Sequence, residues 1–197
     1  VLLKKHKDKL DAEAIQMLEF MLNSSKRFET IVASLKQYTK ADSGRLHIER
    51  VSLNKLIDQV LNDLKILIKI TQANIKVNSL PDIETDKVKL KIVFHHIIEN
   101  ALKYKSNKVP EILIDGTTEK GVVTILIADN GLGIAPEHIE RIQEPFARLH
   151  SKFEIEGIGL GLPLCQKIMK RLNGDFHLKS DTGKGTNVLV TLPLKIK

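Results

Sequence analysis

Asp129-Asn130-Gly131-Leu132-Gly133-Ile134 is the stretch of sequence from which the fold of this chain is predicted. It follows the apolar run VVTILIA at 122–128, whose β-branched residues predict a short buried strand ending at Asp129. Gly131 and Gly133 can adopt positive φ, and they would let a ligand approach the backbone closely. The pattern predicts the floor of a nucleotide site, and an ordinary β-turn is the alternative for an isolated Asp-Asn-Gly.

Composition limits the classes of function that this chain can serve. With 197 residues and 42% hydrophobic content, it is long enough for one domain and a smaller appendage. A net charge of +7 would suit nucleic acid or an anionic membrane, but 4% aromatic content without Trp weighs against stacking on bases. We therefore expect a surface of solvated lysines, with no nucleic acid partner. No apolar run is long enough to span a membrane, so we expect no membrane contact by this chain.

The single cysteine, Cys165, excludes an internal disulfide framework. It falls with Ile168, Met169 and Leu172 on one helical face, so we expect its thiol to pack in the core.

Residues 1–40 are helical in character and carry a heptad seam, typical of a coiled coil or dimeric bundle. Packing of this seam against the chain's own domain is the alternative. Asp42-Ser43-Gly44 ends the helix with turn-forming residues. The seam consists of Leu18, Met21, Ser25, Phe28, Val32, Leu35 and Thr39.

Hydrophobic periodicity predicts an alternation of helices and strands in the remaining chain. Ser52 and Asp86 are expected to cap two of the helices. Pro81-Asp82 is expected to form a turn, 144–156 a loop, and Gly174 the end of the last helix. Helices are predicted at 53–70, 86–104, from 136, and after 157–162, and strands at 75–77, 111–117, 122–128, 176–180 and 187–192.

Two of these helices carry polar or glycine-rich features that point to a phosphate ligand. The helix at 86–104 has an apolar face and, beside it, a polar stripe of His96, Asn100 and Lys103. The run GIGLGL at 157–162 precedes a helix, where unpaired backbone amides favour phosphate. A Rossmann site is the rival interpretation, but no predicted strand leads into these glycines.

Five segments in order resemble the N, G1, F, G2 and G3 boxes of the histidine-kinase branch of the GHKL (HATPase_c) ATPases. They are HHIIENALKYK (95–105), DNGLGI (129–134), EPFARLH (144–150), GIGLGL (157–162) and GKGT (183–186). The resemblance covers about residues 51–197 and implies an α+β class with the Bergerat fold. That fold is a two-layer α/β sandwich with a mixed sheet and helices on one face.

Residues 1–40 resemble the end of a dimerisation and histidine-phosphotransfer helical hairpin. We therefore expect two domains, a part of that hairpin at 1–45 and a catalytic ATP-binding domain at 46–197. The stretch FARLHSKFEIEGIGLGL is similar to sensor kinases of the phytochrome and PAS-linked type.

The resemblance implies that ATP and Mg²⁺ are the cofactors. Asp129 would accept a hydrogen bond from the exocyclic amine of adenine, and Tyr104 would cover the adenine or ribose. Asn100 would be a Mg²⁺ ligand and would act in catalysis with His96 and Lys103. The other residues expected to contact the nucleotide are Gly131, Gly133, Ile134, Phe146, Arg148, Gly157, Gly159, Leu160, Gly161, Leu162 and Thr186.

The segment 135–156 would be a lid, with Phe146 as its apolar latch and Arg148 or Lys152 reaching the γ-phosphate. His96 departs from the family pattern, because kinases often have Asn at that position and hydrolytic relatives have a general-base Glu. Its lack of a carboxylate favours phosphoryl transfer over hydrolysis. The other histidines of the domain expected at 46–197 lack metal-ligand spacing, and we interpret them as surface or packing residues. They are His47, His95, His138, His150 and His177.

The function implied is that of the catalytic part of a two-component sensor histidine kinase. The γ-phosphoryl would pass to a histidine and then to an aspartate of a response-regulator receiver domain, in a homodimer formed through the N-terminal helix. We expect a cytoplasmic location, as part of a larger sensor. His6 lacks the context of an acceptor, so this sequence is expected to bind ATP without labelling itself. The alternatives are a GHKL ATPase of the gyrase, HSP90 or MutL kind, or a degenerate nucleotide-binding scaffold.

Overall fold

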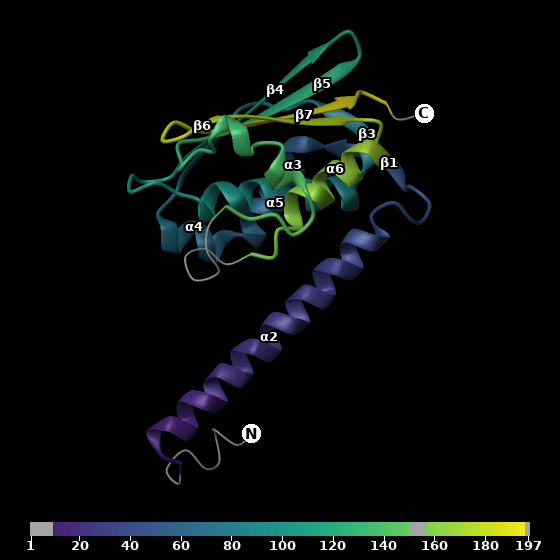
Figure 1. The fold of residues 1–197 in the computed structure, drawn as a ribbon. Helices are drawn as coiled ribbons and strands as arrows, with labels where there is room; N and C mark the ends of the chain where they lie inside the picture. Colours follow the sequence, from purple (N-terminus) through teal and green to yellow (C-terminus); the bar gives the residue numbers. More distant parts are fainter. Residues whose placement is uncertain (1–9, 150–156, 196–197) are drawn as a thin grey trace.

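The computed structural model describes residues 10–149 and 157–195. It consists of a long N-terminal helix and a two-layer domain in which helices cover one face of a sheet (Figure 1). The helices are α2 (Ala12–Lys40), α3 (Leu53–Asp63), α4 (Lys65–Thr71), α5 (Lys87–Lys103) and α6 (Gly161–Arg171), with 3₁₀ turns at Pro136–His138 and Arg141–Gln143. The strands are β1 (Ile48–Ser52), β2 (Asn74–Val77), β3 (Asp82–Asp86), β4 (Glu111–Glu119), β5 (Val122–Asp129), β6 (Asp175–Asp181) and β7 (Gly185–Pro193).

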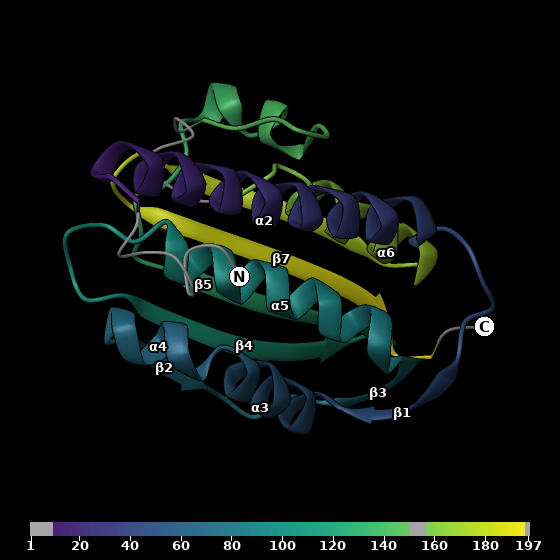
Figure 2. The same ribbon diagram turned by 90° about the horizontal axis from the view of Figure 1, so that it is seen from below.

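Five strands form the main sheet in the order β2-β4-β5-β7-β6. The pairing of β2 with β4 is parallel, and the other three pairings are antiparallel. Helices α3, α4, α5 and α6 lie on one face, with α5 running across the middle (Figure 2). The predicted class, a mixed sheet with helices on one face, is thereby confirmed.

The core lies between the sheet and the helices, because successive side chains along each strand point to opposite faces of the sheet and the apolar ones face the helices. Ile112 and Ile114 on β4 face the same side as Val123, Ile125 and Ile127 on β5, and all of them are buried. The apolar stripe of α5 and the inner face of α6 cover them, and Cys165 is among the buried residues. Full burial raises the pKa of the Cys165 thiol far above its ordinary value, so the thiol is an inert packing group.

A separate antiparallel pair, β1 with β3, was not predicted from the sequence. Ile48 pairs with Asp86 and Ser52 with Asp82. The turn expected at Pro81-Asp82 is therefore wrong, because Asp82 is the first residue of β3. Both strands are largely polar. Each contains one buried hydrophobic residue, Val51 in β1 and Ile83 in β3. Such a short apolar signal is too weak for periodicity to identify a strand.

The helix predicted over 53–70 is two helices, α3 and α4, separated at Leu64. Leu64 has φ of −91° and ψ of 5°, but its amide donates to the carbonyl of Val60 and its carbonyl accepts from the amide of Ile68, both at 3.0 Å, so the break is a local distortion. No Gly or Pro marks the position, which is why the sequence predicted a continuous helix. Ser52 precedes α3 but makes no side-chain cap, whereas Asp86 caps α5 by accepting from the Lys89 amide at 3.0 Å.

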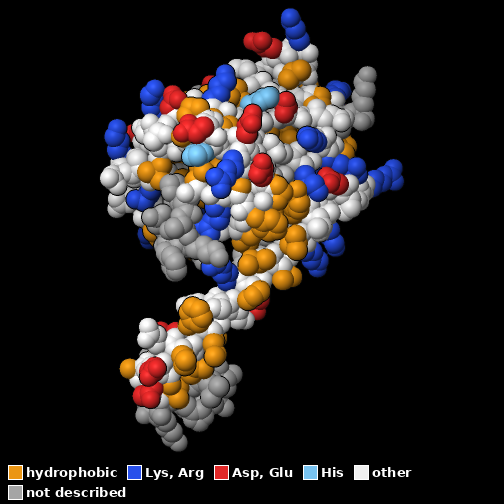
Figure 3. Space-filling view, viewed as in Figure 1, with side chains coloured by type: hydrophobic (Ala, Val, Ile, Leu, Met, Phe, Trp, Pro, Cys, Tyr) orange, Lys and Arg blue, Asp and Glu red, His pale blue; other side chains and the backbone are white. Residues whose placement is uncertain are grey.

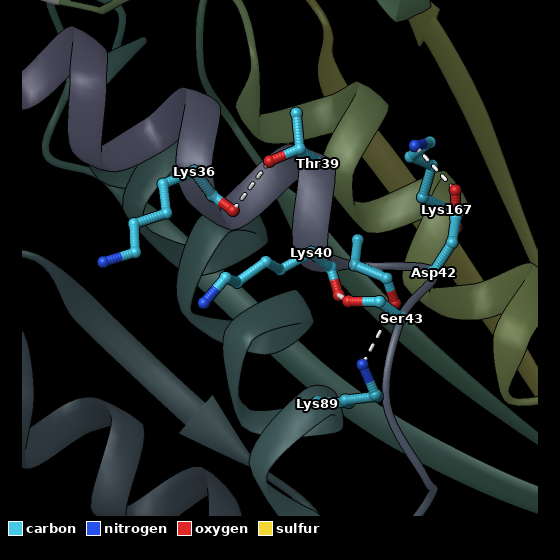
Figure 4. Close-up of polar contacts among 8 residues, drawn as sticks. Lys36, Thr39, Lys40, Asp42, Ser43, Lys89 and Lys167 are labelled. Carbon is cyan, nitrogen blue, oxygen red and sulfur yellow. Dashed lines mark hydrogen bonds and ion pairs between the residues drawn. The ribbon is translucent and has the colours of Figure 1, made fainter.

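Helix α2 runs beneath the helical layer and diverges from it toward its N-terminal end (Figures 1 and 2). Its C-terminal end is tied to the domain (Figure 4). Lys167 on α6 pairs with Asp42 at 2.7 Å and lies 4.4 Å from the centre of the Tyr38 ring. Lys89 on α5 donates to the carbonyl of Ala41 at 3.0 Å. We call these contacts the α2 anchor.

The predicted heptad seam of α2 is not covered by the chain's own domain. No residue of α2 is buried, and Phe28 and Val32 are 69% and 63% exposed. Hydrophobic side chains are visible along the helix in Figure 3. In the described parts of the chain, no helix is both long and apolar enough to cross a bilayer.

Candidate functional site

A cavity of about 790 Å³ lies where α5, the start of α6, the turn after β5 and the start of β7 meet. Its volume falls in the range of pockets that enclose small-molecule ligands. Most of the residues predicted to contact a nucleotide line it, although they come from five separate parts of the sequence. They are His96, Asn100, Lys103, Tyr104, Asp129, Gly133, Ile134, Arg148, Gly157, Gly159, Leu160, Gly161, Leu162 and Thr186.

Two predicted residues, Gly131 and Phe146, do not line the cavity. Gly131 does not adopt positive φ; a Cβ there would instead lie 2.5 Å from the carbonyl oxygen of Tyr104. Only glycine therefore lets this turn pack against the end of α5, where Leu132 donates to the same carbonyl at 2.9 Å. Gly133 does have positive φ, 68°, as expected.

Phe146 is 57% exposed and has a φ of 67°. Its amide donates to the carbonyl of Gly159 at 2.9 Å, which ties the predicted lid to the glycine run by backbone contact. Lys152 and His150, which belong to the same predicted lid, lie outside the described residues.

Asp129 is the last residue of β5, at the bottom of the cavity. Its Oδ1 accepts from the amides of Gly131 at 2.8 Å and Thr186 at 3.1 Å. Burial raises the pKa of this carboxyl, and the two hydrogen bonds oppose the rise. Both bonds use Oδ1, which leaves Oδ2 as an acceptor for a ligand.

Ser180 on β6 holds this corner together, and the sequence did not single it out. Its hydroxyl accepts from the amide of Ile134 at 2.8 Å and donates to the carbonyl of Gly185 at 2.8 Å. It also lies 3.0 Å from the hydroxyl of Thr186. A serine near the end of a strand normally faces solvent, so no local pattern could have identified this role.

The polar stripe of α5 faces the cavity as predicted, and it includes one residue that the sequence did not single out, Glu99. Its carboxylate pairs with Lys103 at 2.8 Å and lies 3.9 Å from Nδ1 of His96. Burial lowers the pKa of His96, with the charge of Glu99 opposing this effect. His96 is therefore a neutral imidazole at neutral pH.

The glycine run places the N-terminus of α6 at the cavity. Gly159 has a φ of 76°, and α6 begins at Gly161. A Cβ on Gly161 would lie 3.3 Å from Nδ1 of His96, so α5 and α6 approach closely at this point. Backbone amides in the first turn of a helix lack partners within the helix and favour anions.

Helix α2 forms the remaining wall of the cavity with a largely polar stripe that differs from its heptad seam. The spacing of these residues matches one face of a helix. They are Phe20, Asn23, Ser24, Arg27, Thr30 and Ser34.

Comparison with known proteins places the domain in a family of ATPases. A family model described as histidine kinase-, DNA gyrase B-, and HSP90-like ATPase matches residues 85–196. The phytochrome-like protein Cph1 of Synechocystis sp. is 30% identical over 190 residues, which cover 96% of this chain and 25% of Cph1. The sensor histidine kinase AtsR of Burkholderia thailandensis is 27% identical over 205 residues, covering 100% of this chain and 34% of AtsR. The chain thus spans a quarter to a third of the length of these relatives.

Among solved structures, full-length ShkA in complex with AMPPNP has a TM-score of 0.77 to this chain at 22% identity. The match covers 95% of this chain and 40% of ShkA. It shows that the helix and the sandwich domain together form a fold known from that structure.

Proposed function

Because the chain belongs to the HATPase_c family of histidine kinase-, DNA gyrase B- and HSP90-like ATPases, we propose that it is the ATP-binding catalytic part of a sensor histidine kinase. The similarity to the phytochrome-like protein Cph1 and to the sensor kinase AtsR favours this branch of the family. The observation that carries the proposal is the cavity, which joins Asp129, the polar stripe of α5 and the start of α6.

Asp129 would select adenine at the bottom of the cavity. A carboxylate oxygen can accept a hydrogen bond from the exocyclic amine of adenine, whereas guanine presents a carbonyl oxygen there, which the carboxylate would repel. Tyr104, which also lines the cavity, would cover the base or ribose.

The phosphates would lie between α5 and the start of α6. The backbone amides at the start of α6 and the charges of Lys103 and Arg148, which line the cavity, suit a triphosphate. Mg²⁺ fits the same wall, since Asn100 offers an amide oxygen in the cavity and Mg²⁺ prefers oxygen ligands. When bound, the ion would neutralise charge on the phosphate oxygens.

We propose that the γ-phosphoryl is transferred to a histidine of a phosphotransfer helix and then to an aspartate of a response-regulator receiver domain. Residues 1–45 would belong to the phosphotransfer hairpin and 46–197 to the catalytic domain, and two copies would associate through α2. His96 carries no carboxylate that could activate water, which favours transfer over hydrolysis. This feature disfavours the ATPase alternative, and a scaffold without catalysis remains the other candidate.

Nucleotide binding tests the proposal directly. A fluorescent ATP analogue should bind the chain and be displaced by ATP but not by GTP. Asp129→Asn should weaken binding on the order of 10- to 100-fold, as expected for loss of a hydrogen bond to a charged group. Asp58→Asn, which changes an exposed carboxylate on α3, is the matched control and should bind normally.

Equal affinity of Asp129→Asn and wild type would overturn the assignment of the site. Rapid steady-state ATP hydrolysis by this chain would favour the ATPase alternative. In the full-length protein, Asp129→Asn should abolish labelling of a response regulator from radiolabelled ATP, and unchanged labelling would favour the scaffold.

A further inference from the structure

Three side chains with metal-binding atoms gather on one turn of α5. One ligand atom each from His95, His96 and Glu99 lies within 4.8 Å of the others. His95 and Glu99 are four residues apart and His96 and Glu99 three, which are the spacings that place side chains together on a helix. We call these three residues the α5 triad. The sequence had suggested a surface or packing role for His95, because no metal-ligand spacing was identified among the histidines.

The donor atoms of the triad differ from those that suit Mg²⁺. Two imidazole nitrogens and one carboxylate oxygen are a set that holds Zn²⁺ through three protein ligands, with a fourth position open. Mg²⁺ favours oxygen alone, as offered by Asn100 and phosphate. Zn²⁺ and Mg²⁺ would therefore prefer different residues of α5, Zn²⁺ the α5 triad and Mg²⁺ the neighbouring Asn100.

The two oxygens of Glu99 have different neighbours. Oε1 pairs with Lys103 at 2.8 Å, and Oε2 is the oxygen that lies 3.9 Å from Nδ1 of His96. A metal ion on Oε2 would therefore leave the contact with Lys103 in place, and that contact would fix the orientation of the carboxylate.

The triad can be reached from solvent, and its ligand atoms are nearly close enough together to bind one ion. All three residues line the large cavity, and the side chains of His96 and Glu99 are 26% and 25% exposed, so an ion can reach them from solvent. Bond lengths of about 2.0–2.2 Å in a tetrahedral zinc site require ligand atoms roughly 3.3 Å apart. The separations of up to 4.8 Å would therefore have to shorten by up to about 1.5 Å, through rotation of the side chains.

We propose that His95, His96 and Glu99 form a site for Zn²⁺ and chemically similar divalent transition metals, separate from the Mg²⁺ ligands of the nucleotide. The fourth position would face the cavity and hold water. This inference does not depend on ATP binding, because all three protein ligands belong to α5 itself.

Zinc binding in the absence of nucleotide tests the proposal. Titration of the chain against a chromogenic zinc chelator should reveal one site that a large excess of Mg²⁺ does not displace. His95→Gln and Glu99→Gln should each weaken it on the order of 10- to 100-fold. His177→Gln is the matched control, since His177 pairs with Asp175 at 2.9 Å on β6 and lies outside the triad.

Co²⁺ provides a second measurement, since its visible absorption reports the geometry of its ligands. The wild-type spectrum should show imidazole ligation and should revert to that of hydrated Co²⁺ in His95→Gln. Undiminished zinc affinity in both His95→Gln and Glu99→Gln would overturn the proposal. His95→Gln should still bind the ATP analogue in a buffer that is freed of transition metals and contains Mg²⁺, so that failure of the zinc site and failure of the nucleotide site are measured separately.

Discussion

Asp129 combines structural contacts within the fold with the proposed role in binding the nucleotide. Its Oδ1 joins the end of β5 to the turn at Gly131 and to the start of β7 at Thr186. The same burial that makes these bonds strong raises the pKa of the carboxyl, so its ionised form is held at a cost to stability. A neutral Asn at this position would also offer a side-chain oxygen to the two amides, so the charge is not required for these contacts.

The raised pKa of Asp129 predicts a pH dependence of ATP binding. The carboxyl takes up a proton at higher pH than an ordinary aspartate, and the protonated form is a poorer acceptor for the adenine amine. Affinity for the ATP analogue should therefore fall as the pH is lowered, starting above the usual range for aspartate. Asp129→Asn should bind weakly with no such dependence, and a parallel decline in that variant would contradict the assignment.

The raised pKa of Asp129 affects folding stability in the opposite direction, because stability should rise as the pH is lowered. An acid whose pKa is higher in the folded than in the unfolded state costs stability while it is ionised, and the cost disappears as the pH falls through the folded pKa. The melting temperature of Asp129→Asn at neutral pH should accordingly be no lower than that of the wild type.

At the scale of elements, the α2 anchor sets where the long helix lies. Lys167 pairs with Asp42 (Figure 4) and also lies over the Tyr38 ring, and Lys89 donates to the carbonyl of Ala41. Asp42 is largely exposed, so the ion pair adds little to global stability, at most about 1 kcal/mol. These contacts therefore orient α2 more than they stabilise the domain.

Lys167→Met should lower the free energy of unfolding by less than about 2 kcal/mol, the sum of an exposed ion pair and a cation–π contact. It should nevertheless broaden the distance between a spin label on α2 and one on the sheet. Lys184→Met is the control, because its 3.2 Å pair with Asp181 lies within the β6–β7 hairpin. Unchanged distance distributions in Lys167→Met would show that other contacts position α2.

Elements with a strong hydrophobic period could be predicted, and those defined by tertiary contact could not. The helix with Asn100 and the strand ending at Asp129 were identified because each carries an apolar stripe or run. Strands β1 and β3 were missed because they are short, largely polar and defined by pairing with each other. Likewise, Glu99 and Ser180 gain their roles only from neighbours that the fold supplies.

At the scale of the whole molecule, the seam of α2 is an exposed apolar feature that the described parts of the chain leave uncovered. Its residues repeat as in a coiled coil, and a different, largely polar stripe of the helix lines the cavity. A second copy of α2 is therefore the partner that fits, in agreement with the proposed dimeric kinase.

Val32→Glu should weaken self-association, because a charge would replace an apolar group at the centre of the seam in both copies. Each buried valine contributes about 1.5 kcal/mol or more, so the dissociation constant should rise on the order of 100-fold. Gln37→Glu adds the same charge on the opposite side of the helix and serves as the control. Sedimentation equilibrium measures the dissociation constants of the two variants, and equal values for Val32→Glu and Gln37→Glu would exclude the seam as the interface.

The position of β7 in the sheet has a consequence for how the protein is made. β7 is the last strand along the chain, yet it lies between β5 and β6 and pairs with both. During synthesis, β5 would therefore expose an unpaired edge until residues 185–193 leave the ribosome, and such edges invite aggregation. Because Thr186 on β7 also supplies one of the amides bonded to Asp129, the nucleotide site would form only when translation of the domain is nearly complete.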